Sequence, residues 1–221
     1  MSVAAIVPAA GRGERAGVDK LWIDVAGRPL IAHTLERIAA VASIQSIAVV
    51  CPEARHGTVR EIAAGLAVTV IAVPGGARRR DSVAAGLRAL GDPEIVVVHD
   101  AARPLVSAAL VEAVIAAARR HGAATAGIPC VDTIKRVDGG MVVETLSRQS
   151  LVCVQTPQAF AASLLRRAHA ANDEDASDDC VLVERLGEPV AVVPGEIGNR
   201  KITHGEDLEW LRRQLHRGPA P

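Results

Sequence analysis

The stretch that decides the fold is Ser2-Val-Ala-Ala-Ile-Val-Pro-Ala-Ala-Gly-Arg-Gly-Glu-Arg-Ala-Gly-Val-Asp-Lys20, at the start of the chain. Residues 3–7 form a short apolar run with the length and β-branched content of a buried strand. The run ends at Pro8, and small and basic residues follow it. The segment therefore predicts a buried first strand that opens into a loop able to bind a ligand.

This loop combines glycines with positive charge. Glycines let backbone N–H groups approach an anion closely, and fixed cationic side chains then neutralise it. The glycine spacing differs from the dinucleotide fingerprint, and Lys20 lacks the neighbours that a Walker loop requires. We predict a polyphosphate site in which side chains reach across the loop; the alternative is a solvated loop that is merely basic. The residues concerned are Gly11, Gly13, Gly17, Arg12, Arg15 and Lys20.

Lysine is rare in this chain and occurs only at Lys20, Lys135 and Lys201, while arginine supplies the other basic residues. Lysine offers a compact point charge on a flexible stem, which a planar guanidinium cannot imitate. Each lysine is therefore a candidate functional residue, although we expect Lys135 to be peripheral.

Composition limits the size and the class of the protein. A chain of 221 residues, 49% of them apolar, is long enough for one well-buried domain. The aromatic fraction of 1% argues against base-stacking platforms for nucleic acid. The formal net charge of zero argues against attraction to DNA or to an anionic membrane. We expect no nucleic-acid or membrane partner.

The four cysteines are widely spaced and include no C-x-x-C pair. Without such a pair or a recognisable signal peptide, they are expected to be reduced thiols in a cytoplasmic protein. The cysteines and histidines form no cluster in the sequence that would indicate a metal site.

Apolar runs alternate with segments of helical period along most of the chain. Strands that alternate with helices predict an α/β fold, here a Rossmann-like, mostly parallel sheet covered by helices on both faces. We expect strands at 3–7, 46–51, 67–73, 94–98, 123–129 and 189–193. Helices are expected at 29–42, 53–64, up to about 90, 107–121, 160–172, from 177, and 206–217.

The alternation is interrupted between residues 131 and 150. Residues 133–137 and 141–146 flank Asp138-Gly-Gly140, a turn with the residues that a β-hairpin requires. A two-stranded ribbon is marginal by itself, so we expect an arm that packs on a second subunit. The chain is therefore predicted to be a single domain, 1–221, with a dimerisation arm at about 131–150.

The candidate ligand residues follow strands of the predicted sheet. Ligands of such sheets bind beyond the carboxyl ends of the strands. Residues 11–20 follow the first strand, residues 75–82 the third, and residues 100–103 the fourth. We therefore expect one shared site at this edge.

With these elements in place, the chain resembles the 2-C-methyl-D-erythritol 4-phosphate cytidylyltransferase family over nearly its whole length. Any one shared motif is weak, but the motifs occur in the right order and at predicted loops or the arm. They are Pro8-Ala-Ala-Gly-Arg-Gly-Glu-Arg15, Gly75-Gly-Ala-Arg-Arg-Arg-Asp-Ser-Val83, His99-Asp-Ala-Ala-Arg-Pro104, Asp132-Thr-Ile-Lys135, Thr156-Pro-Gln158, Ser177-Asp178 and Asn199-Arg-Lys-Ile-Thr203.

The resemblance implies an enzyme that joins CTP to a phosphorylated polyol, 2-C-methyl-D-erythritol 4-phosphate, and releases pyrophosphate in isoprenoid biosynthesis. It also implies Mg²⁺, a cytoplasmic location and a homodimer with exchanged arms. The catalytic residues implied are Arg15, Lys20 and Lys201, with Asp100 near the metal. The nucleotide would contact Pro8, Ala9, Ala10, Gly11, Gly13, Gly75, Gly76, Arg79, Ser82, Asp100 and Ala101. The acceptor would contact Arg103, Thr133, Arg148, Thr156 and Ser177, with Thr133 and Arg148 reaching the neighbouring subunit.

Asp19 departs from the family, which usually has proline before this lysine; Asp19 would pair with Lys20 or help to hold the metal. Several other residues also have structural alternatives. Asp100 and Ser82 are alternatively caps of a turn and of a helix. His99 is expected to pack at a strand end rather than act as a base. Among the consecutive arginines, Arg79 is expected to be functional, and Arg78 and Arg80 to form a solvated face.

Rival functions share parts of this pattern. A ribitol-5-phosphate cytidylyltransferase has a similar glycine pair, Asp-Ala-Ala-Arg turn and arm. A molybdenum-cofactor guanylyltransferase lacks the arm and the turn, and a metal-dependent glycosyltransferase would need an Asp-x-Asp motif. A non-catalytic nucleotide-binding module is the alternative from another class, and Arg15, Lys20, Asp100 and Lys201 together exceed what binding requires. The acceptor and the nucleotide are therefore left to experiment.

Overall fold

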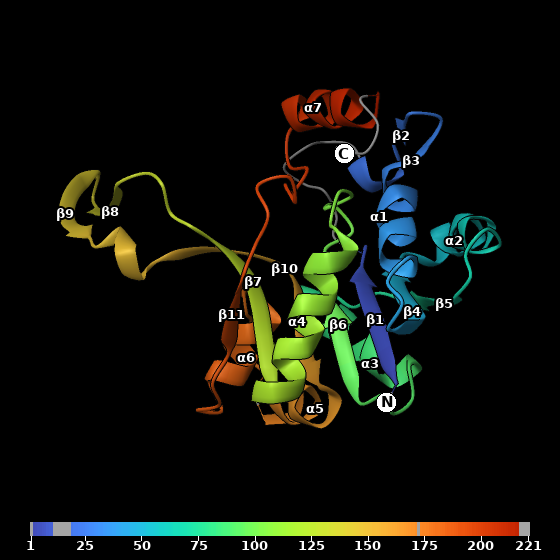
Figure 1. Cartoon of the computed structure of the whole chain (residues 1–221), viewed down its shortest axis with the longest axis horizontal. Helices are drawn as coiled ribbons and strands as arrows, with labels where there is room; N and C mark the ends of the chain where they lie inside the picture. Colours follow the sequence, from blue (N-terminus) through green and yellow to red (C-terminus); the bar gives the residue numbers. More distant parts are fainter. Residues whose placement is uncertain (1, 11–18, 172, 217–221) are drawn as a thin grey trace.

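The computed structural model describes residues 2–10, 19–171 and 173–216. It shows an α/β fold built on a mixed sheet with the strand order β11-β7-β10-β6-β1-β4-β5 (Figure 1). All neighbouring strands of this sheet run parallel except at β10, which is antiparallel to both β6 and β7. The strands are β1 (Val3–Pro8), β4 (Ile44–Cys51), β5 (Thr69–Pro74), β6 (Ile95–Val98), β7 (Ala123–Pro129), β10 (Val152–Ala161) and β11 (Ala191–Pro194).

Helices cover both faces of the sheet, as predicted. Alternate side chains of each strand point to opposite faces, so Ala5 and Val7 join one core while Ile6 joins the other. The first core is covered by α1 (Leu30–Ala39), α2 (His56–Ala63) and α4 (Ala108–His121). The second is covered by α3 (Arg79–Ala89), α5 (Ala162–Ala171) and α6 (Asp179–Glu184).

Short elements and α7 (Gly205–His216) complete the chain. Figure 1 places α7 beyond the end of the sheet toward which β1 points. In the described part of the chain, no helix has both the length and the apolar character needed to cross a membrane. The short elements are η1 (Lys20–Trp22), η2 (Glu53–Arg55), η3 (Arg148–Ser150) and the ribbon of β2 (Asp24–Val25) and β3 (Arg28–Pro29).

Strand β10 is the main element that the sequence did not predict. The expected helix at 160–172 begins only at Ala162, and Phe160 lies fully buried in β10. Pro157 interrupts the apolar pattern, and the pairing with β7 shifts register between Gln155 and Gln158. A proline inside a strand argues against a central strand. The local pattern therefore concealed a strand that tertiary pairing on both sides stabilises.

Smaller differences occur at the ends of helices. Pro29 is the N-cap of α1 rather than its first residue. It also belongs to β3, where it is paired with Asp24 of β2. The segment predicted as one helix at 53–64 begins as η2 and continues as α2. Ser107 is confirmed as a cap, because its side chain accepts a hydrogen bond of 3.0 Å from the Leu110 N–H.

The predicted hairpin is confirmed as β8 (Ile134–Asp138) and β9 (Met141–Leu146). Gly139 and Gly140 have φ values of +53° and +81°, the left-handed backbone that this turn requires. Figure 1 shows the hairpin standing away from the sheet. Its apolar side chains are open to solvent in the single chain, with Met141 72% exposed and Val142 59% exposed. An arm with uncovered apolar side chains fits a surface that a second subunit covers.

All four cysteines are free thiols. Cys51 and Cys180 are buried, and burial raises the pKa of Cys51 to about 11. Cys130 and Cys153 lie at the root of the arm with their sulfur atoms 3.2 Å apart. The side-chain hydrogen bond with Cys153 raises the pKa of the Cys130 thiol. This pairing was not expected from the spacing of the cysteines in the sequence.

Candidate active site

The carboxyl ends of β1 and β5 bring two predicted ligand loops into contact. A Cβ atom added at Gly75 would lie 2.2 Å from the Ala10 Cβ atom, so only glycine fits there. Ser82 joins the same loop, since its hydroxyl accepts from the Gly76 N–H at 3.2 Å and donates to the Arg78 carbonyl at 3.3 Å. The helix itself is capped by Asp81, which binds the Arg78 N–H, so Ser82 does not cap it. The small residues therefore let the two loops approach each other closely at this edge of the sheet.

Asp100, after β6, lies within a cluster of cations. The Lys201 Nζ atom is 2.9 Å from the Asp100 Oδ2 atom, and the Arg103 Nε atom is 3.5 Å from the same oxygen. Burial alone would raise the pKa of Asp100, but Lys201, Arg79 and Arg103 outweigh it and hold the pKa at about 2. The Asp100 side chain is 14% exposed and the Lys201 side chain is 49% exposed. An ionised carboxylate and an accessible ammonium therefore share one face of the site.

Residues 199–203 are fixed against the Asp100 turn, which explains why Lys201 lies beside it. The Arg103 Nη1 atom donates to the Asn199 carbonyl at 2.8 Å, and the Ile202 N–H donates to the Ala102 carbonyl at 2.8 Å. Asn199 is fully buried, and its amide donates to the Thr156 carbonyl at 2.7 Å and to Gln155 Oε1 at 3.2 Å. Asn199 belongs to a motif of the sequence that does not by itself indicate a role for this residue. A polar residue close to the apolar Ile202, in a turn that packs into the interior, is the signal that identifies Asn199 as a supporting residue.

Thr156 and His99 form a hydrogen-bonded chain behind this turn. The Arg103 carbonyl can only accept, so the His99 Nε2 atom, 3.1 Å away, carries the proton. The His99 Nδ1 atom then accepts from the Thr156 hydroxyl at 3.2 Å, and that hydroxyl accepts from the Asp100 N–H at 2.9 Å. Burial lowers the pKa of His99 to about 4. His99 is therefore a neutral, fully buried residue that supports the turn.

The neutral state of His99 makes folding stability depend on pH. Its pKa falls from 6.5 to about 4 in the folded chain, so below pH 6.5 the unfolded chain binds a proton that the folded chain excludes. The contribution is fully present above pH 6.5 and is lost as the pH falls toward 4, at a cost of about 3 kcal/mol. We expect urea titrations to show a steeper loss of unfolding free energy between pH 7 and 4.5 in the wild type than in His99→Gln. Equal slopes would contradict the assignment.

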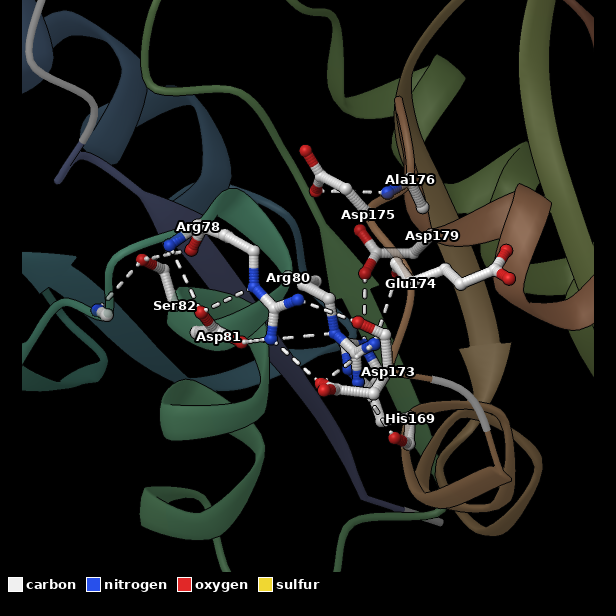
Figure 2. A network of polar contacts seen from close by, with 11 residues as sticks. Arg78, Arg80, Asp81, Ser82, His169, Asp173, Glu174, Asp175, Ala176 and Asp179 are labelled. Atoms are coloured by element: carbon white, nitrogen blue, oxygen red, sulfur yellow. Dashed lines mark hydrogen bonds and ion pairs between the residues drawn. The ribbon is translucent and has the colours of Figure 1, made fainter.

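The consecutive arginines correct one prediction. Arg80 is 7% exposed and does not belong to a solvated face. Its Nη1 and Nη2 atoms donate to the Glu174 and His169 carbonyls at 3.2 and 3.0 Å. Arg78 binds Asp81 at 2.9 Å and Asp173 at 2.9 Å (Figure 2). Both arginines therefore tie the start of α3 to the segment between α5 and α6, because each finds acceptors on that segment.

Arg79 lies on the same turn but has a different partner. Its Nη1 atom donates to Asp179 Oδ2 at 2.7 Å, and the other Asp179 oxygen lies 3.1 Å from the His169 Nε2 atom. Asp179 is fully buried. Asp179 is not among the residues predicted from the sequence, although Ser177 beside it is, because a carboxylate at the start of a short helix is indistinguishable from a cap in the sequence. The first turn of α6 is in fact capped by Asp178, whose Oδ1 atom accepts from the Val181 N–H at 3.1 Å.

Asp19 is the first described residue after the glycine-rich segment, and its carboxylate has a partner on another element. The Asp19 carboxylate lies 3.7 Å from the Arg55 guanidinium, which also lies over the Trp22 ring at 5.1 Å. The partner that the structure shows for Asp19 is therefore Arg55, which the sequence did not suggest, and Lys20 begins η1 directly after Asp19. Predictions for Gly11, Arg12, Gly13, Arg15 and Gly17 fall outside the residues that the structure describes.

A single chain does not assemble all the predicted acceptor residues. Arg103 and Thr156 lie beside Asp100, and Ser177 precedes α6. Thr133 and Arg148 belong to the projecting arm, where Arg148 binds the Val131 carbonyl (Figure 1).

The donor set around Asp100 fits one magnesium ion that takes its other ligands from a nucleotide. Mg²⁺ is typically held by one or two carboxylates together with substrate phosphates and water. Among the described residues there is no group of three or more histidine, cysteine, aspartate or glutamate side chains that would form an all-protein site. Asp100, which stays ionised, is the carboxylate that would hold the ion.

The chain is similar to known proteins over nearly its whole length. Residues 3–216 match the model of the family described as 2-C-methyl-D-erythritol 4-phosphate cytidylyltransferase. The chain is 42% identical to the protein of that name from Desulforamulus reducens, with 98% of this chain and 97% of the relative covered. It is 43% identical to the bifunctional enzyme IspD/IspF of Anaeromyxobacter dehalogenans, with 96% of this chain covered, and spans 57% of that longer protein. The crystal structure of 4-diphosphocytidyl-2C-methyl-D-erythritol synthase from Anaerococcus prevotii is similar, with a TM-score of 0.88 and 32% identity over 98% of this chain and 99% of that one.

Proposed function

This chain belongs to the 2-C-methyl-D-erythritol 4-phosphate cytidylyltransferase family, and we propose that it transfers the cytidylyl group of CTP to 2-C-methyl-D-erythritol 4-phosphate. Pyrophosphate is the second product. The observation that carries the proposal is the Asp100 turn, where an ionised carboxylate, the Lys201 ammonium and the Arg103 guanidinium meet at the same carboxyl edge of the sheet as the close approach of Gly75 to Ala10. Such a concentration of charge suits a reaction between two phosphorylated substrates.

In the proposed reaction a phosphate oxygen of the acceptor attacks the α-phosphorus of CTP in line with the departing pyrophosphate. The attacking oxygen is already ionised, so no general base is needed, and the rate comes from positioning and charge stabilisation. Lys201 neutralises charge on the α-phosphate as it develops. Arg15 and Lys20 grip the triphosphate and stabilise the leaving pyrophosphate. Mg²⁺, held by Asp100, would screen the charge of the phosphates when bound.

The nucleoside would lie against backbone atoms of the two loops. Small residues allow that approach, and the scarcity of aromatic side chains leaves backbone hydrogen bonds as the main source of selection for cytosine. Arg79 and Asp100 would lie at the phosphate end. The proposed contact residues are Pro8, Ala9, Ala10, Gly11, Gly13, Gly75, Gly76, Arg79, Ser82, Asp100 and Ala101.

The acceptor phosphate would be bound by Arg103, Thr156 and Ser177 of one subunit and by Thr133 and Arg148 of the other. The exposed apolar side chains of the arm support a homodimer in which each arm lies across its partner. A closed two-fold pair makes the two sites equivalent.

Pyrophosphate release tests the proposal directly. We expect release only when CTP, 2-C-methyl-D-erythritol 4-phosphate and Mg²⁺ are all present. CTP supplies the departing pyrophosphate, the acceptor supplies the attacking oxygen, and Mg²⁺ would screen the charge of the phosphates. A coupled phosphate assay would compare CTP with GTP and the methylerythritol acceptor with ribitol 5-phosphate. Faster turnover with ribitol 5-phosphate would assign the rival cytidylyltransferase activity. CTP binding in calorimetry without pyrophosphate release from either acceptor would indicate a non-catalytic nucleotide-binding module.

A further inference from the structure

Arg79 has a buried carboxylate partner on one side of its guanidinium group. The Nη1 atom donates to Asp179 Oδ2 at 2.7 Å, and this hydrogen bond joins the start of α3 to the start of α6. Asp179 has no exposed surface, and the Arg79 side chain is 27% exposed. A charge-assisted hydrogen bond at this distance is among the strong ones, so it fixes the direction of the guanidinium plane.

Asp179 is itself held from a second direction. Its Oδ1 atom lies 3.1 Å from the His169 Nε2 atom on α5, so both carboxylate oxygens have partners (Figure 2 labels Asp179 and His169). Burial raises the pKa of Asp179, but Arg79 and His169 outweigh it, and the net pKa lies below the usual value. The carboxylate therefore stays charged and has a single orientation.

The other side of the Arg79 guanidinium has a different environment. Its Nη2 atom is buried and has no hydrogen-bond partner among the residues that the structure describes. Burial lowers the pKa of Arg79, but the charges of Asp179 and Asp100 outweigh burial and raise it. Arg79 thus has one carboxylate in direct contact with its Nη1 atom, while its Nη2 atom makes no hydrogen bond to the described residues.

The neighbouring arginines differ from Arg79 at their terminal nitrogens. Both terminal nitrogens of Arg80 bind main-chain oxygens, so only its Nε atom lacks a hydrogen-bond partner, and that atom lies 3.9 Å from Asp81. The Arg78 guanidinium binds Asp81 and Asp173. Buried arginine–carboxylate pairs are moreover weak sources of stability, because desolvation offsets their attraction. The contact between Arg79 and Asp179 is therefore better explained by the placement of a ligand-binding group than by the stability of α3 against α6.

We propose that Asp179, supported by His169, is a positioning residue that holds the Arg79 guanidinium so that its Nη2 atom remains available to the phosphates of the bound nucleotide. This inference rests on the proposed function, since it assigns a role in binding CTP. Asp179 does not itself touch the nucleotide. The loss of Asp179 should weaken the binding of the nucleotide and leave the binding of the acceptor unchanged.

The first test replaces Asp179 with asparagine, which keeps the volume and one acceptor oxygen but removes the charge. We expect the KM for CTP to rise about tenfold, the size typical of a weakened charged hydrogen bond, with the KM for methylerythritol phosphate unchanged. Asp173→Asn is the matched control, because Asp173 holds Arg78 in the same network at 2.9 Å. Its KM for CTP should stay within twofold of the wild type. An unchanged KM for CTP in folded Asp179→Asn would overturn the proposal.

The second test is a double-mutant cycle with Arg79→Ala. If Asp179 acts through Arg79, Asp179→Asn should change the KM for CTP no further once Arg79 is absent. Additive effects of the two substitutions would instead mean that Asp179 acts by another route, and the proposal would fail. Should Asp179→Asn not fold by circular dichroism, His169→Gln replaces it in the cycle, with a smaller rise of about threefold expected and the same non-additivity required. Wild-type turnover is measured first, because its absence would overturn the proposed function rather than this inference.

Discussion

Replacing Lys201 with alanine is expected to lower kcat by about a hundredfold or more while the chain stays folded, because in the proposed reaction the change removes a preorganised charge from the reacting phosphate. Lys201 is half exposed and lies 2.9 Å from Asp100 at the edge of the site, so its removal leaves no cavity in the core. Steady-state rates of pyrophosphate release and a thermal melt of the variant would check both parts of the statement.

Lys201→Arg is the informative control for this prediction. A planar guanidinium cannot occupy a site shaped for a point charge, so we expect the variant to stay well below wild-type activity. Arginine is the common basic residue of this chain, and lysine at this position is one of few. Full activity in Lys201→Arg would show that the rarity of lysine has no chemical meaning at this position.

The second large effect concerns the arms. Arg148→Ala and Lys201→Ala proteins are each expected to be nearly inactive alone, but a mixture whose subunits exchange should recover about a quarter of wild-type activity. In a heterodimer with exchanged arms, one site receives both defects and the other receives neither. Statistical mixing makes half of the dimers heterodimers, which accounts for the quarter.

The control for this experiment is a direct measure of subunit exchange, for instance native mass spectrometry of subunits with different tags. If exchange is complete and activity remains at the level of the single variants, the arm serves its own subunit. A monomer in the same measurement would remove the basis for the exchanged arm, because the exposed Met141 and Val142 would then need another explanation.

Much of the fold could be predicted because its elements carry local signals. The first strand, the cap at Ser107 and the turn at Gly139-Gly140 each depend on neighbouring residues, and the structure confirms all three. Strand β10 depends instead on pairing with β6 and β7, and both of these strands lie more distantly in the sequence, before the arm. No local pattern could reveal it, since Pro157 breaks the alternation that usually marks a strand.

The candidate site divides in the same way. Glycine positions and isolated lysines are visible in a sequence, and Gly75, Asp100 and Lys201 do lie at the predicted edge of the sheet. The partners that hold these groups are not visible, because Asn199 and Asp179 act through three-dimensional contacts of otherwise ordinary polar residues. The prediction that Arg80 lies on a solvated face is wrong for the same reason, since its acceptors are main-chain carbonyls of a distant segment.

The position of β10 has a consequence for how the chain assembles during synthesis. Strands β6, β1, β4 and β5 stand next to one another in this order in the sheet, and all four are complete once residue 98 has been made. Strand β7 comes next in sequence, but its neighbours in the sheet are β10 and β11, so it has no edge to join until residue 161 has emerged. We expect a nascent chain of about 140 residues outside the ribosome to protect β1 and β4 from protease while β7 is still cleaved.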